Sequence, residues 1–127
     1  MTATKTVVIA DDRERCTEVV QHLLARPDCE VIVRRLPLGD YQIGGRMLLE
    51  RKRWTDLVAS IVDGRLFHQA CRLAASPLHA VLLLEGSEED IAESRMTREA
   101  IQGALVTVSL ILGIPVLRSP MQKNPQS

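Results

Sequence analysis

Short apolar runs rich in β-branched residues alternate in this chain with segments whose apolar residues recur at helical spacing. The first pattern predicts strands and the second predicts helices. Strands are expected at residues 6–10, 30–36, 40–43, 46–51, 80–84 and 115–118. Helices are expected at residues 15–25, 54–62, 65–75 and 97–112. This order predicts an α/β fold with a mixed central sheet that is flanked by helices on both faces.

Length and composition narrow the class of protein. A chain of 127 residues suits one domain, which we expect at residues 1–118, followed by a flexible polar tail at 119–127. A hydrophobic content of 46% with 25% charged residues is typical of a globular protein and excludes a disordered chain. An aromatic content of 2% argues against a protein that binds single strands by stacking bases.

Targeting and membrane signals are weak. The longest apolar stretch, residues 104–117, is interrupted by polar residues, Gly113 and Pro115, so no membrane span is expected. The N-terminus lacks a secretory pattern, and the three cysteines lack the spacing of a zinc site. We therefore expect an intracellular protein, cytoplasmic in a prokaryote or nuclear in a eukaryote.

Charge is unevenly distributed although the formal net charge is zero. Residues 31–75 carry eight Lys or Arg against four Asp or Glu. A zero net charge argues against binding nucleic acid by bulk charge alone. The basic middle segment is either a solvated face or a surface for phosphates, and charge alone leaves both readings open.

The hairpin predicted around Gly44-Gly45 brings charged residues together. Glu50 and Lys52 are two apart in a strand, so they share a face, and the turn returns that strand beside Asp40. Asp56 follows one helical turn later as a third carboxylate. Mg²⁺ is usually held by one or two carboxylates plus substrate phosphate, and an ammonium can stabilise developing charge. Taken alone, the pattern fits a salt-bridged, solvated hairpin as well.

The wider sequence resembles the nuclease domain of the XPF/Mus81/Hef family, also called the ERCC4 type. Gly39-Asp40, nine residues, Glu50-Arg51-Lys52, three residues and Asp56 match that family's signature throughout. The element Asp11-Asp12-Arg13-Glu14 resembles the family's D-x-R-E. Residues 60–65 with Gln69, residues 80–86 and residues 113–116 fit its later segments. The resemblance covers roughly residues 6–118.

The resemblance implies a restriction-endonuclease-like core and Mg²⁺- or Mn²⁺-dependent cleavage of DNA near branches or flaps, as in repair and recombination. It implies that Asp40 and Glu50 are metal ligands and that Lys52 lies beside the attacking water. Asp11, Glu14, Arg51 and Asp56 would complete the catalytic surround. Contacts to the site or to DNA are expected from a further set of side chains, Arg53, Arg65, Gln69 and Arg72.

Two expectations concern partners. Family members usually carry a helix–hairpin–helix module, which this sequence lacks. We therefore expect a stand-alone nuclease or one that takes DNA affinity from a partner. The segment 97–112 is apolar most of the way round, which predicts burial against a second subunit. The resemblance also implies pairing of nuclease domains, so a homodimer or heterodimer through residues 97–118 is expected.

Two other readings compete. The run Val8-Ile9-Ala10-Asp11-Asp12 with Asp56 in mid-chain resembles a response-regulator receiver. However, Asp56 opens a helix instead of ending a buried strand, and no Lys follows position 52 before Lys123. The second reading is a non-catalytic DNA-binding or dimer-scaffold subunit. The intact Asp40, Glu50, Lys52 and Asp56 positions argue against it.

Overall fold

The computed structural model describes residues 4–119. Its strands are β1 (Thr6–Ala10), β2 (Cys29–Val33), β3 (Tyr41–Ile43), β4 (Met47–Arg53), β5 (His79–Glu85) and β6 (Val116–Ser119). Its α-helices are α1 (Glu18–Leu24), α2 (Trp54–Val62), α3 (Leu66–Ala74) and α4 (Arg98–Val106). Short 3-10 turns occupy Asp12–Glu14 and Glu88–Ile91, and a π-helical turn occupies Thr107–Ile111.

The six strands form one mixed sheet in the order β2-β1-β3-β4-β5-β6. β1 pairs in parallel with β2 and antiparallel with β3, which forms the predicted antiparallel hairpin with β4. The pairs β4–β5 and β5–β6 are parallel. The mixed sheet predicted from the order of elements is therefore confirmed. Its two antiparallel pairings are unlike the parallel sheet of a receiver, which excludes that reading.

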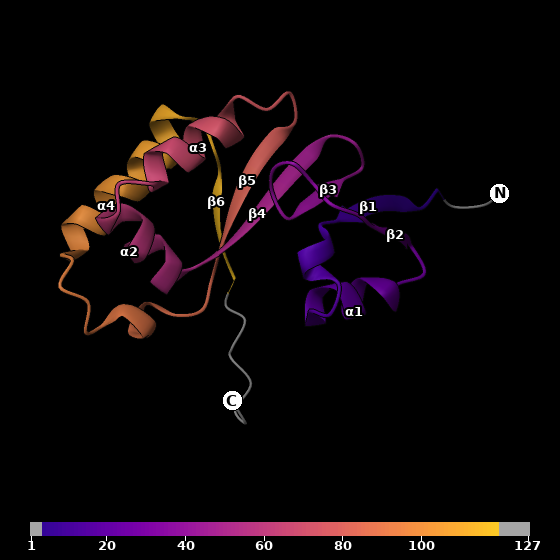
Figure 1. The fold of residues 1–127 in the computed structure, drawn as a ribbon, viewed down its shortest axis with the longest axis horizontal. Coiled ribbons are helices and arrows are strands. Elements are labelled where there is room, and N and C mark those ends of the chain that lie inside the picture. The colour runs from indigo at the N-terminus through magenta and orange to yellow at the C-terminus, as the bar shows by residue number, and fades with distance from the viewer. Residues whose placement is uncertain (1–3, 120–127) are drawn as a thin grey trace.

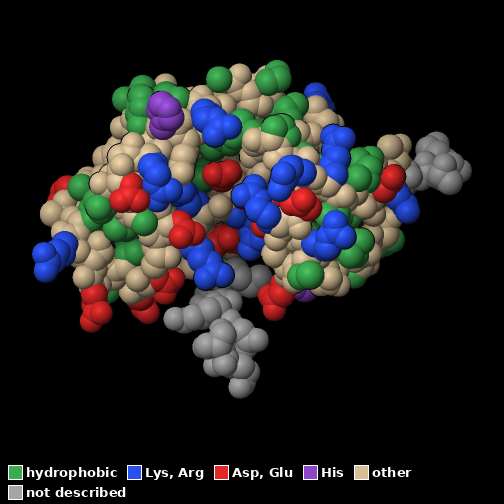
Figure 2. Space-filling view, viewed as in Figure 1, with side chains coloured by type: hydrophobic (Ala, Val, Ile, Leu, Met, Phe, Trp, Pro, Cys, Tyr) green, Lys and Arg blue, Asp and Glu red, His purple; other side chains and the backbone are tan. Residues whose placement is uncertain are grey.

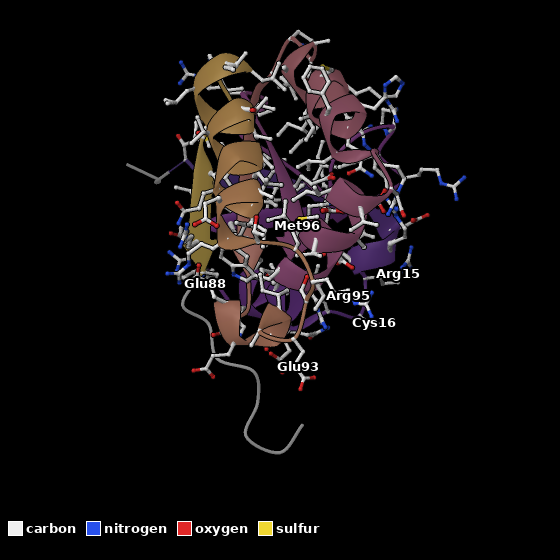
Figure 3. The ribbon with its side chains drawn as sticks, turned by 90° about the vertical axis from the view of Figure 1, so that its left-hand side faces the viewer. Arg15, Cys16, Glu88, Glu93, Arg95 and Met96 are labelled. Carbon is white, nitrogen blue, oxygen red and sulfur yellow. The ribbon has the colours of Figure 1, made fainter. Side chains whose placement is uncertain are left out.

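Helices cover both faces of the sheet, but at opposite ends of it. α1 packs against β2 over a small core made of Val8, Ala10, Val20 and Tyr41. On the other face α2, α3 and α4 gather over β4, β5 and β6 (Figure 1). Turned by 90°, the molecule shows α3 and α4 in front of the sheet (Figure 3). The larger core lies beneath them and includes Leu48, Leu57, Leu84 and Ile114.

Two helix predictions need correction. The helix expected at residues 97–112 ends as α4 at Val106 and continues as a π-helical turn, in which Leu112 N–H donates to Thr107 O. The Ser109 hydroxyl donates to Leu105 O and competes for a carbonyl of the helical ladder. The helix expected from Arg15 begins later, because the Thr17 hydroxyl accepts from Val20 N–H and caps α1 there.

Large apolar side chains remain exposed at the end of the α4 segment, by which we mean α4 together with the π-helical turn that follows it, residues 98–111. Val106, Leu110 and Ile111 are 49%, 78% and 73% exposed. In the part of the chain that is described, every helix is too short or too polar to cross a bilayer. Of the tail predicted at 119–127, Ser119 belongs to β6, and residues 120–127 lie outside the described residues.

Candidate active site

Asp40 and Glu50 lie beside the last pair of the β3–β4 ladder. Tyr41 pairs with Leu49 there, and Asp40 N–H donates to Leu49 O at 2.9 Å, so Asp40 and Glu50 occupy the positions immediately beyond that pair. The Asp40 carboxylate accepts from Arg51 N–H at 2.8 Å and is therefore held against β4. The convergence predicted from the hairpin is present.

Gly39 allows the chain to enter β3 at this point. Its φ is +78°, a left-handed conformation that side chains with a Cβ rarely adopt. A Cβ at this position would lie 2.5 Å from Leu48 Cδ1, so the backbone packs directly on the core side chain next to Glu50. The Gly-Asp pair is thus a structural unit, because the glycine permits the approach that brings the aspartate to the site.

Burial dominates the electrostatics of the two carboxylates. Desolvation raises the pKa of Asp40, although the hydrogen bond from Arg51 N–H opposes the shift. Desolvation and the negative charge of Asp40 raise the pKa of Glu50, while Lys52, Arg13 and Arg72 oppose that shift. Two half-buried carboxylates that repel each other favour binding of a cation between them.

Lys52 reaches the same side of the sheet as Glu50. Both line a small cavity, together with Gln69 and an apolar wall that α3, β5 and Ile114 contribute. Lys52 Nζ donates to Gln69 Oε1 at 3.1 Å, so α3 fixes the direction of the ammonium group. Gln69, which the sequence placed at the site or on the DNA, thus orients Lys52.

Glu14 and Arg51 form a network on the opposite face of the sheet. Arg51 donates through Nη1 to Glu14 and through Nε to Glu85, the latter at 2.9 Å. The Tyr41 hydroxyl donates to Glu14 at 2.6 Å. Burial and the hydrogen bond to Glu14 raise the pKa of Tyr41. Arg51 and Glu14, predicted as parts of the catalytic surround, therefore tie together β3, β4, β5 and the 3-10 turn behind the site.

Asp11 is fully buried, with 1% of its surface exposed. Its carboxylate accepts from Leu36 N–H at 2.8 Å, from Arg13 N–H at 3.2 Å and from Arg13 Nε at 2.6 Å. Burial alone would raise the pKa of Asp11, but these hydrogen bonds outweigh it and lower the pKa to about 2. Asp11 N–H donates to Asp40 O at 2.8 Å. Asp11 is therefore an anchor beside the site.

The remaining predicted residues lie at the surface. Asp56 is exposed in the first turn of α2 and belongs to none of the hydrogen bonds or ion pairs found within residues 4–119. Arg53 and Arg72 are also exposed, and Arg72 acts on the pKa of Glu50. Arg65 pairs with Asp63 on an exposed turn. Acidic and basic side chains meet in the middle of one face, between the α2–α4 layer and the β1–β2 end (Figure 2).

The donor set suits a hard divalent cation. Asp40 and Glu50 supply carboxylate oxygens, the ligands that Mg²⁺ and Mn²⁺ prefer. No cluster of three or more His, Cys, Asp or Glu side chains suited to a metal occurs among residues 4–119. A cation held by these two carboxylates would keep most of its coordination shell for water and substrate, which is the usual arrangement for Mg²⁺ at phosphates.

Three residues of the site region were absent from the sequence prediction. Glu85 is the last residue of the buried β5 strand, at the edge where the parallel β4 also ends, and this position was the available signal. Tyr41 directly follows Asp40, and its side chain points to the opposite face, towards Glu14. Arg13 lies inside the D-x-R-E element, but the spacing of that element did not show that Asp11 would hold it.

The fold and the paired carboxylates define a class of protein. A mixed six-stranded sheet flanked by helices, with two acidic residues and a lysine at the β3–β4 junction, is a restriction-endonuclease-like fold. Two solved structures similar to this chain are XPF from Aeropyrum pernix in complex with DNA and XPF from Aeropyrum pernix. Each has a TM-score of 0.79, at 29% and 31% identity, and covers 91% and 89% of this chain.

The sequence comparisons agree. The model of the ERCC4 domain matches residues 10–125, and the chain belongs to the ERCC4 domain family. It is 33% identical over 92% of its length to the 3'-flap repair endonuclease Xpf of Saccharolobus solfataricus. It is 36% identical over 96% of its length to the DNA repair protein RAD1 of Saccharomyces cerevisiae. The chain spans 50% of the first of these relatives, 13% of the second and 56% of each Aeropyrum pernix chain.

Proposed function

We propose that the chain is a divalent-metal-dependent DNA endonuclease that hydrolyses phosphodiester bonds near branches or flaps. The single observation that carries the proposal is the convergence of Asp40 and Glu50 just beyond the last pair of the β3–β4 ladder, with the charge of Lys52 beside them. The relatives support the reaction class, because those named above are an endonuclease and a DNA repair protein. A purely structural hairpin would not need two half-buried carboxylates that repel each other.

Asp40 and Glu50 would hold a Mg²⁺ or Mn²⁺ ion, which supplies Lewis-acid polarisation of a phosphate and acidification of a bound water. Lys52 presents its ammonium group on the same side as Glu50, held by Gln69. From there it donates to a water or to negative charge that develops on the phosphate. The Glu14–Arg51–Glu85 network keeps β4 in place, so that Glu50 and Lys52 keep their positions during the reaction.

Arg53 and Arg72 are exposed, and the charge of Arg72 acts on Glu50, so we assign both arginines to DNA phosphates. Contacts of this kind hold DNA without reading its sequence. Because the formal net charge is zero, the isolated chain should bind DNA weakly. A DNA-binding partner, or a second copy, would supply the affinity that branched DNA requires.

We also propose that the chain dimerises through the α4 segment. Val106, Leu110 and Ile111 protrude there. A shallow cavity of about 220 Å³ beside them is lined largely by apolar residues of α2, α3 and α4, which extends the apolar surface. Contiguous exposed apolar patches of this kind mark interaction sites.

The direct test is cleavage of labelled flap, fork, bubble and plain duplex DNA in Mg²⁺ and in Mn²⁺. We expect cutting near the branch points. Asp40→Asn and Glu50→Gln should abolish it, since each removes a metal ligand. Lys52→Ala should lower the rate by roughly 10²-fold, the usual scale for a lost charge stabiliser.

Glu18→Gln is the matched control, because Glu18 is an exposed carboxylate on α1. It should cut like the unaltered protein. Circular dichroism must show that the site variants are folded. Undiminished cutting by Glu50→Gln would refute the assignment. If the unaltered protein binds branched DNA without cutting it in either metal, the scaffold reading holds instead.

A further inference from the structure

The β2-β1-β3 end of the sheet has one covered face and one open face. α1 packs on one face, over Val8, Ala10 and Tyr41. The helices of the other face, α2, α3 and α4, pack over β4, β5 and β6 instead (Figure 1). Val7 and Ile32, which alternate with the covered residues, are accordingly 37% and 41% exposed. The side chains that alternation assigns to this surface, which we call the open face, are those of Val7, Ile9, Glu30, Ile32, Arg34 and Gln42.

The open face lies on the same side of the sheet as the proposed site. Gln42 pairs with Leu48 on β4 and with Ile9 on β1, and Ile9 pairs with Ile32 on β2. Leu48 belongs to the core beneath α2, α3 and α4. Glu50 follows Leu48 by two residues in β4, so its side chain is on that side too. The open face therefore continues from the proposed metal ligands towards β2.

Arg34 is at the same end of the sheet as the site. Its N–H donates to Ala10 O at 3.0 Å, which continues the pairing of β2 with β1. Asp11 N–H then donates to Asp40 O at 2.8 Å, which connects β1 to the start of β3. Arg34 follows Ile32 by two residues, so alternation directs its side chain to the open face. Two spacings of about 4.8 Å between strands place Arg34 roughly 10 Å from Asp40.

The Arg34 side chain is available to a ligand. It is exposed, and it forms no hydrogen bond or ion pair with residues 4–119. Exposed Lys5 and Arg46 immediately precede β1 and β4, at the other end of the open face, where Glu30 is the acidic residue. Lys and Arg side chains gather over β1, β3 and β4 (Figure 2). The charge of this surface therefore suits an anionic partner beside the site.

Double-stranded DNA fits the open face better than a single strand. Single strands are usually held by aromatic side chains that stack on the bases. The chain has one Trp, one Tyr and one Phe, and these lie elsewhere. Trp54 is in the larger core, Tyr41 is beneath α1, and Phe67 is on α3. An arginine beside a flat aliphatic surface can instead bind the backbone of a duplex through its phosphates.

We propose that the open face supports a duplex arm of the branched substrate, and that Arg34 binds a phosphate of this arm. The inference rests on the proposed function and adds the path that the DNA takes away from Asp40 and Glu50. A duplex rises about 3.4 Å per base pair, so the roughly 10 Å between Asp40 and Arg34 correspond to about three base pairs. The contact is with the backbone, so it holds the arm whatever its sequence.

The test is DNA binding by Arg34→Gln, measured by fluorescence anisotropy with Ca²⁺ in place of Mg²⁺. Affinity for forked DNA and for plain duplex should fall about three- to tenfold, and the magnitude of the slope of log Kd against log salt should decrease by about one. Affinity for a single-stranded oligonucleotide should stay unchanged. In cleavage of forked DNA, the KM should rise more than the kcat falls, because a binding contact is lost.

Arg35→Gln is the matched control. Arg35 is exposed and directly follows Arg34, but alternation directs its side chain to the other side, so the variant should bind like the unaltered protein. Arg34→Lys keeps the charge and should keep the salt slope. Glu30→Gln removes negative charge from the open face and should tighten duplex binding about two- to threefold. Glu18→Gln, on α1, should have no such effect.

Each outcome supports or overturns the path. An unchanged duplex affinity and salt slope in Arg34→Gln would overturn it, and so would an equal loss in Arg35→Gln, which indicates a general effect of charge. An equal loss of single-strand affinity would overturn the choice of a duplex. If binding depends on Arg34 as expected but the unaltered protein cuts no DNA in Mg²⁺ or Mn²⁺, the proposed function fails and the path of the DNA stands.

Discussion

The charged residues near the β3–β4 junction fall into two groups by the partners they have. Asp11, Glu14, Arg51 and Glu85 satisfy one another, or backbone donors, within the fold. Asp40 has one backbone donor, and Glu50 shares a cavity with Lys52 against apolar side chains. The first group stabilises the fold. The second group, Asp40 and Glu50, carries negative charge that the fold compensates less fully, so this charge is available to bind a ligand. Active sites commonly retain such unfavourable charge at the expense of stability.

At the residue scale we predict that Glu50→Gln stabilises the metal-free protein at pH 7. Because the pKa of Glu50 is raised on folding, its ionised form opposes folding. The stability of the folded state that depends on protonated Glu50 is present below the unfolded pKa, near 4.3. It is lost as the pH rises through the raised folded pKa. Thermal unfolding in EDTA should show a gain of about 0.5–2 kcal/mol at pH 7, the usual scale for such changes.

The same experiment has an internal check. The difference between Glu50→Gln and the unaltered protein should shrink as the pH is lowered towards 4, where Glu50 becomes protonated. Added Mg²⁺ should raise the melting temperature of the unaltered protein and not that of the variant. Glu30→Gln, at an exposed position on β2, is the control and should show neither effect. A variant less stable than the unaltered protein at pH 7 would contradict the electrostatic account.

At the scale of elements, the β3–β4 hairpin organises the site. β3 has only three residues, yet it joins β1 to β4, and the backbone of Asp40 binds both Asp11 and Leu49. Arg51, on β4, carries the ion pairs to Glu14 and Glu85 behind the site. A displacement of this hairpin would therefore move both proposed ligands and Lys52 together.

We expect Gly39→Ala to be more damaging than Gly44→Ala. Both glycines have positive φ, which costs roughly 1–2 kcal/mol for a residue with a Cβ. At Gly39 the new methyl group also meets Leu48, and such overpacking adds about 1–3 kcal/mol. Gly44 has no atom within 4 Å of the same position, so it isolates the cost of strain. Urea denaturation measures both, and equal losses would refute the packing argument.

At the scale of the whole molecule, the proposed site and the exposed apolar side chains of the α4 segment lie on different elements. The site lies where β3 and β4 meet, whereas Val106, Leu110 and Ile111 protrude from the end of the α4 segment. A second copy on the apolar face would leave Asp40 and Glu50 accessible. It would also double the phosphate contacts of a chain whose net charge is zero.

We predict that Leu110→Glu converts a dimer to a monomer. Leu110 is 78% exposed, so the substitution places no charge in the core of the monomer but places one in the proposed interface. Sedimentation equilibrium at micromolar concentration should give a dimer mass for the unaltered chain and a monomer mass for the variant. Leu24→Glu, at a 58% exposed position on α1, should remain a dimer. A monomer mass for the unaltered chain would refute the proposal.

Local patterns in the sequence determined most of the secondary structure. Helix α2 matches its predicted bounds, because the apolar stripe from Trp54 to Val62 is bounded by the β4 strand and Asp63-Gly64. The order of strands and helices was also predictable, and so was the convergence of Asp40, Glu50 and Lys52. Two-residue alternation and a two-residue turn are local rules, which operate without knowledge of distant contacts.

Tertiary structure alone determined which charged side chains are bound by other residues of the fold. Arg13 and Arg51 both lie beside acidic residues in the sequence. Arg13 is exposed and pairs with the buried Asp11, whereas Arg51 is bound by Glu14 and Glu85. Glu85 is 34 residues from Arg51, and only the parallel pairing of β4 and β5 brings them together. The π-helical turn at Thr107–Ile111 and the exposure of Leu110 likewise depend on packing. Whether a side chain is free or bound is set by contacts between distant segments, and sequence spacing carries no record of those contacts.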